Sequence, residues 1–482
     1  MSTDNEQFIP NRHAVSSDCM LNLKSSSVSG KSYRASVPAT NGTSFISQQT
    51  TIMYIPAGRR NTFLDPQQTY LKFTIQNTST TAGDNFYLDT TGASPIQSIN
   101  IYHGSNLLET ITTYNVLFNY IIDSQMNFSE KYGSSAALGS SGIELGYRAG
   151  ALLTANNGTN PSNSLTVCLP VISGLFGLGA DRCLPLFALV DDIRIEIVWE
   201  TNQAAFCWVQ ATTPSYKIIQ PELEICMIEL SDEGMRMVNE VTPFNEAVFL
   251  HGNSWRHYTA TLQASSSGNQ SFIAPMRFAS LKTALVLPRS SVTQTSYLAY
   301  SLASRINPNI ATYYWRIGGA LIPQKPVTLY NGSTIYGYAE AYMELVKSWH
   351  GLSKADVGSI LGTDIYNVAD TGDQTVGNAS VKGVYGAGTT ATATTGTTNG
   401  VWVSYQTTNS NLAGFAIATE MELFAGRSDV IISGTNTLSS QMFFEFNIVT
   451  ATSAAAGSYV LDMYANHDII FVLQDGLLTA RY

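Results

Sequence analysis

The sequence predicts an all-β protein with short helices, built as two tandem β-sandwiches that carry long loop insertions. A strand, a glycine turn, a second strand and a helix follow one another at residues 98–120 and again, about 215 residues later, at 312–349. Solenoid repeats recur every 20 to 50 residues or so, so this spacing indicates two whole domains of one architecture. Period-two alternation of apolar residues and a content of 25 tyrosines also favour strands.

The chain divides into three parts, namely an extended arm at residues 1–48, a first sandwich at 49–240 and a second sandwich at 241–482. The arm has no sustained hydrophobic period and is rich in Ser, Asn and Thr, so order is expected to begin near Thr50. The linker between the sandwiches is placed at Val241-Thr242-Pro243, after a short polar helix around residues 233–239.

The first sandwich opens with strands around residues 52–54 and at 69–75, and Phe63-Leu64-Asp65-Pro66 is predicted to be a turn between them. Ile193, Ile195 and Ile197 alternate with Arg194, Glu196 and Val198, the pattern of a half-buried strand. An insertion, rich in Gly, Ser and Asn, occupies about residues 127–163. The remaining elements are a helix at 114–124 and strands at 165–172, 183–190 and 223–230.

The second sandwich contains a helix at residues 334–349, for which Ser333 is a plausible N-cap. A second insertion follows at about residues 352–412. Its stretch 386–400 is almost wholly Gly, Ala, Thr and Asn, so it cannot build a core and should project from the domain. Asp475-Gly476 is predicted to turn the chain into its last strand. The predicted strands are 255–262, 281–287, 442–449, 458–464, 469–473 and 477–482.

Composition limits the function classes. Charged residues make up only 12% of the chain, about half the usual share, so much of the surface must be uncharged or covered by other subunits. A net charge of −10 argues against a nucleic-acid-binding groove, which needs clustered Lys and Arg. Residues 1–60 nevertheless carry six Lys and Arg against three Asp and Glu, a formal +3. A weak contact of this arm with nucleic acid therefore stays open as an alternative.

The cysteines indicate buried free thiols in a reducing compartment. They are odd in number, and their spacing contains no C-x-x-C pair, so neither a disulfide framework nor a zinc site is expected. The polar N-terminus lacks the apolar segment of a signal peptide, and no apolar run approaches the length of a membrane span. The five cysteines are Cys19, Cys168, Cys183, Cys207 and Cys226.

Motifs that carry chemistry are weak. Gly30-Lys31-Ser32 resembles the end of a phosphate-binding loop, but the position where that loop needs its first glycine is Ser25. Gly174 to Gly179 has its glycines in the wrong order for a dinucleotide fingerprint, which favours a bend between strands. Asp191-Asp192 is interpreted as a turn or strand-end pair.

The histidines do not change this picture. His251 and His257 lie six residues apart in a predicted loop and strand, which is a poor metal-ligand spacing. His467-Asp468 is interpreted as a polar edge or interface pair more readily than a catalytic pair. No catalytic, cofactor-binding or metal site is therefore expected, and the chain is not expected to be an enzyme.

Several segments, in order, resemble the double jelly-roll major capsid proteins of virophages, polinton-like viruses and large DNA viruses of eukaryotes. The run from Tyr54 to Pro66 with Tyr70-Leu71-Lys72-Phe73 is similar to the start of the first jelly roll in that family. Leu169-Pro170 to Gly177 and Leu184 to Ile197 are similar to strands F and G of that family. Gly318 to Val327 is similar to the hairpin before the helix of the second jelly roll, and Asp468 to Tyr482 is similar to the closing strand.

The resemblance implies two eight-stranded jelly rolls in a homotrimer of pseudo-hexagonal outline, a capsomer that tiles an icosahedral virion with its neighbours. It implies outward towers of loops after strands D and F, penton and minor capsid proteins as partners, and no active site. Synthesis and assembly inside the host cell would fit the absence of a signal peptide. Two alternatives stay open, namely a lectin-like carbohydrate-binding protein of tandem β-sandwiches and a β-rich hydrolase.

Overall fold

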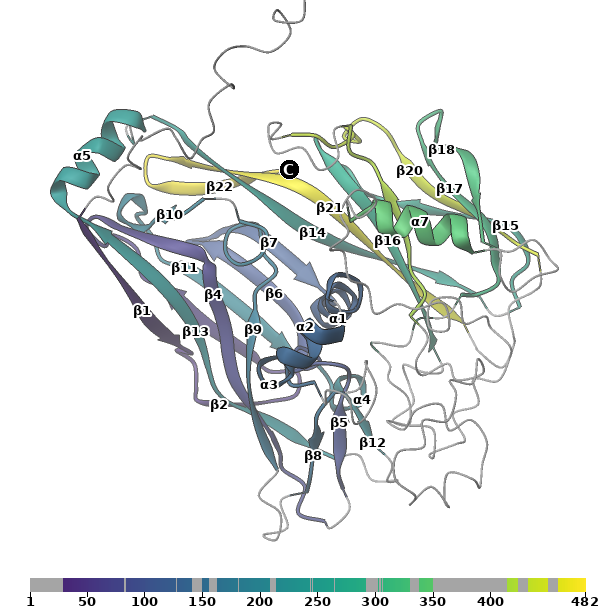
Figure 1. Cartoon of the computed structure of the whole chain (residues 1–482), viewed down its shortest axis with the longest axis horizontal. Coiled ribbons are helices and arrows are strands. Elements are labelled where there is room, and N and C mark those ends of the chain that lie inside the picture. Colours follow the sequence, from purple (N-terminus) through teal and green to yellow (C-terminus); the bar gives the residue numbers. More distant parts are fainter. Residues whose placement is uncertain are drawn as a thin grey trace, which may run out of the picture.

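The computed structural model of the chain describes residues 29–81, 84–126, 128–140, 150–155, 163–180, 182–208, 214–242, 244, 246–263, 265–291, 302, 305, 307–329, 338–349, 414–423, 432–449 and 458–482. Within them the chain forms two β-sandwiches that lie side by side along the long axis of the molecule (Figure 1). In the described residues we find no helix with the length and apolar content needed to span a membrane.

The first sandwich packs a six-stranded sheet against a four-stranded one, and Phe73 meets Trp199 edge-on between them at 5.2 Å. All strand pairs are antiparallel. The larger sheet has the order β1 (Gly30–Pro38), β13 (Tyr216–Leu230), β4 (Thr62–Asn77) and β10 (Leu184–Pro185), with β2 (Ser44–Ile46) also on β13 and β9 (Ser164–Pro170) also on β4. The smaller sheet has the order β3 (Thr50–Ile55), β11 (Ile193–Trp199), β6 (Ile96–His103) and β7 (Asn106–Thr112).

Loops of the first sandwich form additional elements. A small sheet of β12 (Phe206–Trp208), β5 (Phe86–Leu88) and β8 (Leu152–Leu153) lies at the opposite end of the sandwich from α5 (Asp232–Val241), as Figure 1 shows. The described parts of the predicted insertion at 127–163 form β8, α2 (Phe128–Gly133) and α3 (Ser135–Leu138), while 141–149 and 156–162 lie outside the described residues. The other helices are α1 (Tyr114–Gln125), α4 (Asn202–Ala205) and the 3-10 turn η3 (Leu186–Ala188).

The second sandwich packs a five-stranded sheet against a four-stranded one, and the Trp315 indole N–H donates to Thr419 Oγ1 between them at 3.2 Å. The first of these sheets has the order β14 (Val248–Leu262), β21 (Tyr459–Gln474), β16 (Leu281–Ser290) and β19 (Ile417–Glu420), with β22 (Leu477–Arg481) also on β21. The second has the order β15 (Gly268–Ala274), β20 (Met442–Ile448), β17 (Ile310–Ile317) and β18 (Ala320–Thr328).

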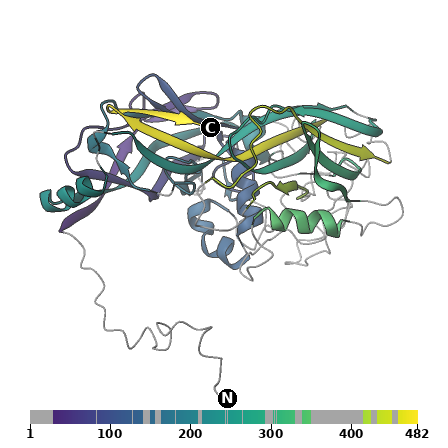
Figure 2. The same cartoon turned by 90° about the horizontal axis from the view of Figure 1, so that it is seen from above.

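The predicted duplication is confirmed. β6, a turn at Gly104, β7 and α1 in the first sandwich correspond to β17, a turn at Gly318, β18 and α7 (Ala339–Lys347) in the second. Both glycines have a φ near +60°, the left-handed conformation that such tight turns require. Figure 2 shows α1 and α7 on the same side of the two sandwiches. The predicted N-cap Ser333 and the predicted insertion at 352–412, with its stretch 386–400, lie outside the described residues.

The predicted turn at Phe63-Leu64-Asp65-Pro66 is wrong, because β4 continues through these residues. The register against β13 jumps from the Asp65 to Cys226 pair to the Tyr70 to Glu224 pair, so Pro66 falls in a bulge. Proline has no N–H to donate to a neighbouring strand, and a bulge is a position where none is needed. The sequence signal for a turn was therefore a signal for an irregularity within one long strand.

Three further predictions are corrected. Order begins before Thr50, because β1 and β2 of the predicted arm pair with β13. Residues 183–190 form a two-residue strand followed by a 3-10 turn instead of one strand. Residues 458–464 and 469–473 belong to one strand, β21, whose burial is nearly continuous because it is the central strand of its sheet.

Candidate functional site at the junction of the two sandwiches

Two motifs considered for phosphate binding or acid–base chemistry have structural roles instead. Gly30-Lys31-Ser32 begins β1, where Gly30 is paired with Leu230, and a strand instead of a helix follows the glycine. Asp191-Asp192 lies in the bend before β11, where Asp192 Oδ1 accepts a hydrogen bond from the backbone N–H of Ala57 at 2.8 Å. The described part of the chain contains no group of three or more His, Cys, Asp or Glu side chains that could hold a metal.

His251 and His257 both lie on β14, and they face different carboxylates of β21. His251 Nε2 is 3.0 Å from Asp468 Oδ1, and His257 Nε2 is 2.9 Å from Asp462 Oδ1. The two histidines therefore do not converge on one site. Each one joins β14 to β21 through a partly buried polar contact.

The prediction that His467 and Asp468 form a polar edge or interface pair is wrong, since β21 is a central strand and both side chains are buried. His467 stacks on Phe278 with the ring centroids 4.0 Å apart, and burial lowers its pKa to about 4. Asp468 instead meets His251 and accepts a hydrogen bond from Ser280 Oγ. Successive residues of a strand point to opposite faces, which separates the two neighbours.

The junction between the sandwiches is centred on Glu109 of β7, which is fully buried. Its carboxylate accepts a hydrogen bond from Ser173 Oγ at 2.5 Å, one from Gly174 N at 3.0 Å, and one from Ser254 Oγ. Ser254 belongs to β14 of the second sandwich, so one side chain is bonded to both halves. Burial raises the pKa of Glu109 above its ordinary value of 4.5, although these hydrogen bonds oppose the shift.

Glycines allow the backbones of the two halves to touch. The backbone N–H of Asn253 in β14 donates to Gly179 O at 2.8 Å, and Gly252 forms an isolated bridge with Ala180. A Cβ atom on Gly252 would lie 2.0 Å from the carbonyl oxygen of Gly174. The glycines from Gly174 to Gly179 thus do more than bend the chain between β9 and β10, because they give β14 room for direct backbone contact.

A second polar group in the junction involves Asp462 of β21. Arg289 Nε donates a hydrogen bond to Asp462 Oδ2 at 2.5 Å, and His257 is the other partner of Asp462. The second ring nitrogen of His257, Nδ1, lies 3.1 Å from Thr112 Oγ1 of the first sandwich. Burial alone would raise the pKa of Asp462, but the charge of Arg289 and the hydrogen bond from His257 outweigh it and lower that pKa. Tyr464 OH also donates to the carbonyl oxygen of Thr113 at 2.9 Å.

The C-terminal hairpin crosses from the second sandwich onto the first. Figure 1 shows β21 and β22, in yellow, reaching over β7, and both β7 and β6 contact β22. The backbone N–H of Leu478 donates to His103 Nδ1 at 3.1 Å, and Tyr482 OH donates to Leu108 O at 3.0 Å. Asp475 and Gly476 form the predicted turn, and both have a positive φ.

No family model and no curated protein matches this sequence. Solved structures do match it over nearly its full length. The Faustovirus major capsid protein aligns with a TM-score of 0.58 at 9% identity, covering 96% of this chain and 94% of that one. The PBCV-1 virus capsid aligns at 0.57 and 11% identity, covering 96% and 99%, and the mavirus major capsid protein at 0.53 and 9% identity, covering 100% and 97%.

The chain has the double jelly-roll fold. In this double jelly roll, the buried carboxylates of Glu109, Asp462 and Asp468 are bonded to groups of the protein itself. The hydrogen bond of Glu109 with Ser254, and that of Thr112 with His257, a partner of Asp462, join the two jelly rolls. The partners His251 and Ser280 of Asp468 both lie in the second jelly roll. The junction is therefore suited to holding the two jelly rolls in one fixed arrangement.

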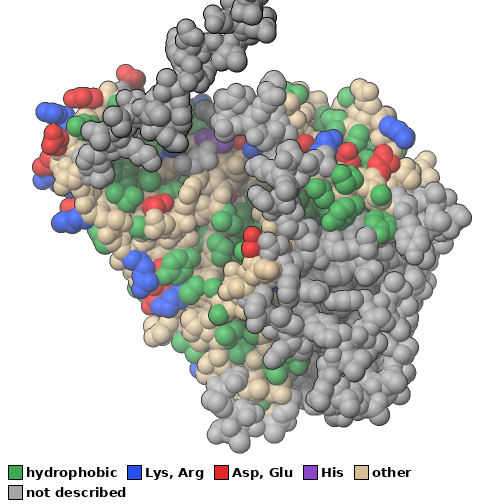
Figure 3. All heavy atoms as spheres, in the orientation of Figure 1, with side chains coloured by type: hydrophobic (Ala, Val, Ile, Leu, Met, Phe, Trp, Pro, Cys, Tyr) green, Lys and Arg blue, Asp and Glu red, His purple; other side chains and the backbone are tan. Residues whose placement is uncertain are grey.

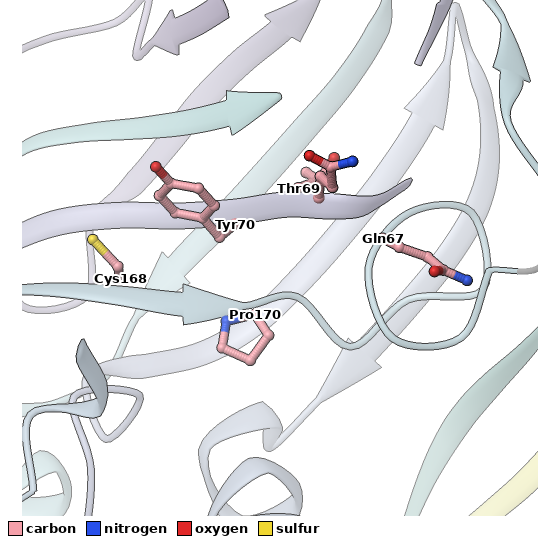
Figure 4. A pocket seen from close by; sticks show the side chains of 6 residues that line it. Gln67, Thr69, Tyr70, Cys168 and Pro170 are labelled. Carbon is pink, nitrogen blue, oxygen red and sulfur yellow. The ribbon is translucent and has the colours of Figure 1, made fainter. Parts of the chain in front are cut away.

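A surface pocket of about 490 Å³ lies where β4 bulges beside β9. Figure 4 shows Tyr70 and Cys168 on neighbouring strands, and Gln67, which also lines the pocket, belongs to the stretch of β4 where the register against β13 shifts. Tyr70 OH accepts a hydrogen bond from Arg34 Nη1 at 3.1 Å, and burial raises the pKa of the Cys168 thiol, which disfavours the reactive thiolate. The pocket offers polar contacts without an activated nucleophile.

Charged side chains are visible in more than one region of the face of the double jelly roll that Figure 3 shows. Figure 3 shows Lys, Arg, Asp and Glu over α5 and the neighbouring strands of the first jelly roll, and a second group of them at the upper right. Sequence reasoning missed the junction residues Glu109, Ser173 and Ser254. The available signal was Glu109 itself, a single acid inside the otherwise apolar and neutral strand Asn106–Thr112.

Proposed function

We propose that this chain is a structural subunit of an icosahedral virus shell, without catalytic activity. The observation that carries the proposal is the alignment of nearly the whole chain with nearly the whole of three capsid proteins. The buried junction supports it, because a shell subunit must transmit force between its two jelly rolls without hinge motion. The proposed location is the virion, after synthesis and assembly inside the host cell.

The proposed assembly is a homotrimer. Three copies of two side-by-side jelly rolls place six similar units in a ring, so a trimer can imitate six-fold packing and tile a shell with neighbouring capsomers. A chain with only 12% charged residues has surface to bury in such contacts. Penton and minor capsid proteins are the further partners that this assembly would need.

The domain limits are proposed at the linker near residue 241, with one jelly roll on each side. The arm proposed earlier is confined to the residues before β1, since β1 and β2 are part of the first jelly roll. Its proposed role is to run beneath the shell and contact neighbouring subunits or, weakly, the genome. The limited excess of positive charge in residues 1–60 supports only a weak contact with nucleic acid.

Light scattering and negative-stain microscopy of the purified full chain test the proposal. We expect a trimer, three times the 52.2 kDa of the chain, with a hexagonal outline in projection. A stable monomer at micromolar concentration would contradict the proposal. Binding to a glycan array by that monomer would support the lectin-like alternative, and turnover of a glycoside or ester would support a hydrolase.

A further inference from the structure

In the described part of the second jelly roll, β15 forms one edge of its four-stranded sheet. β15 pairs with β20 from Gly268 to Ala274, and no described strand pairs with its other side. Four of its seven residues are exposed, and Ile273 has an exposed fraction of 56%. Its sequence, Gly-Asn-Gln-Ser-Phe-Ile-Ala, contains no charged residue and no proline.

Open edges in natural proteins are usually protected against pairing with another chain by charged residues, prolines or a cover. Two other long edge strands carry such protection in their own sequences. β1 contains Lys31 and Arg34. β18, at the opposite edge of the sheet that contains β15, contains Lys325 between Pro323 and Pro326.

The remaining long edges are covered. The side chain of Asn41 occupies the edge of β3, where it accepts a hydrogen bond from Ile52 N at 3.0 Å and donates one to Thr50 O at 2.7 Å. β9 packs against α3, and β7 contacts both β14 and β22 across the junction. Among the described edge strands of five or more residues, β15 is thus the one that has neither charged residues or proline of its own nor a cover formed by described residues.

We propose that the outer edge of β15 pairs with β15 of a second copy of this chain, as two antiparallel strands related by a twofold axis. This inference deepens the assembly role proposed above and rests on it. A second copy presents the same set of edges, and its other long edges are protected or covered. Its own β15 is therefore the edge that can accept the pair.

The composition of β15 suits pairing with itself. Like charges directly opposite each other destabilise a strand pair, and β15 places none there. A pair centred on Ser271 would set Asn269 of one copy opposite Ile273 of the other. The twofold relation makes the contact closed, so it joins two copies without growing into an open fibre.

The side chains beside this edge are also partly apolar. Ile273 lies opposite Phe443 of β20, and the guanidinium of Arg316 stacks over the Phe443 ring at 4.3 Å. Pairing would extend the four-stranded sheet of β15, β20, β17 and β18 across two copies. It would also cover the exposed Ile273 side chain, which gives the contact apolar burial in addition to backbone hydrogen bonds.

Cysteine cross-linking tests the pairing. Asn269→Cys, Ser271→Cys and Ile273→Cys are each placed in the otherwise unchanged full chain, and the chain without substitution under the same mild oxidant gives the baseline for its native thiols. We expect at least one variant to form a disulfide-linked dimer at about ten times the baseline yield or more. Gln324→Cys, exposed on the protected edge β18 of the same sheet, is the matched control and should stay at baseline.

A charge variant measures the consequence for assembly. Asn269→Lys combined with Ile273→Lys should leave trimers intact and prevent their association into larger particles, whereas Gln324→Lys should assemble like the unchanged chain. Trimers without any β15 cross-link, or normal particles from the charge variant, would overturn this inference and leave the proposed function standing. A chain that stays monomeric would overturn the proposed function itself.

Discussion

The helices α1 and α7 close the same strand–turn–strand–helix unit in the two jelly rolls, yet they are buried to very different extents. Every residue of α1 from Tyr114 to Ser124 is buried, whereas in α7 only Ala341 and Leu345 are. Their sequences differ accordingly. α1 has one charged residue, Asp123, while the shorter α7 has Glu340, Glu344 and Lys347.

The difference in burial follows from where each helix lies in the double jelly roll. α1 lies at the junction, where Trp349 Nε1 of the second jelly roll donates to Tyr120 OH at 3.1 Å and Arg305 Nη2 lies 3.1 Å from Asp123 Oδ2. α7 packs against β19 of its own domain. α1 is enclosed on every side, and its buried polar residues Asn115, Asn119 and Asp123 have hydrogen-bond partners, while the amphipathic α7 can lie on a surface. Duplication set the order of elements, and the junction then set their burial.

Deletion of residues 470–482 should have the largest effect on stability, because it removes the part of the second jelly roll that packs on the first. The deletion removes β22 and the end of β21, including the buried Phe471 and Leu478, and exposes β7 and β6 of the first jelly roll. We expect no cooperative thermal transition by circular dichroism. A deleted chain that still melts cooperatively would show that the hairpin is dispensable to both domains.

A matched pair of substitutions tests the two helices directly. Leu117→Ala in α1 removes a side chain with no exposed surface and should lower the free energy of unfolding by about 2–5 kcal/mol. Met343→Ala in α7 removes a side chain with an exposed fraction of 47% and should cost less than about 1 kcal/mol. Urea denaturation of both variants gives the comparison, and equal losses would contradict it.

Two glycines test the junction against a loop outside it. Gly252→Ala places a Cβ atom against the backbone of Gly174, which cannot move without shifting the junction, so we expect a loss of about 1–3 kcal/mol. Gly319→Ala, in the hairpin of β17 and β18, meets no atom within 4 Å and should change stability by less than about 1 kcal/mol. Thermal unfolding of the two variants measures the difference, and a Gly252→Ala chain that melts like the unchanged one would show that the backbone contact is not tight.

The sequence was informative about local order and poor about contacts between distant segments. The duplication, α1, β11 and the turn at Asp475-Gly476 could be predicted because each depends on a short period or a turn residue. The pairing of β1 with β13 could not, since its residues are mostly exposed and have no clear period. The partners of Glu109 come from segments 64 and 145 residues away, a distance that no local pattern reports.

The smallest effect that we predict concerns the strand beneath α7. Glu420 lies in β19, and burial raises its pKa from 4.5 to about 7. The folded chain therefore binds this proton more tightly than the unfolded chain, so ionisation of Glu420 opposes folding as the pH rises from 4.5 through 7. Glu420→Gln removes this titration. Between about pH 5 and pH 8 its free energy of unfolding should gain about 1–2 kcal/mol relative to the unchanged chain, after allowance for partial exposure.

Glu445 on β20 supplies a control of opposite sign in the same jelly roll. The hydrogen bond from Arg316 lowers its pKa, so Glu445 contributes stability above its ordinary pKa and loses it as the pH falls. Glu445→Gln should therefore be less stable than the unchanged chain near neutral pH, and the deficit should shrink in acid. Urea denaturation across this pH range separates the two cases. A Glu420→Gln profile parallel to that of the unchanged chain would mean that β19 beneath α7 is open to water, and the contrast between α7 and the enclosed α1 would then be larger than the buried residues indicate.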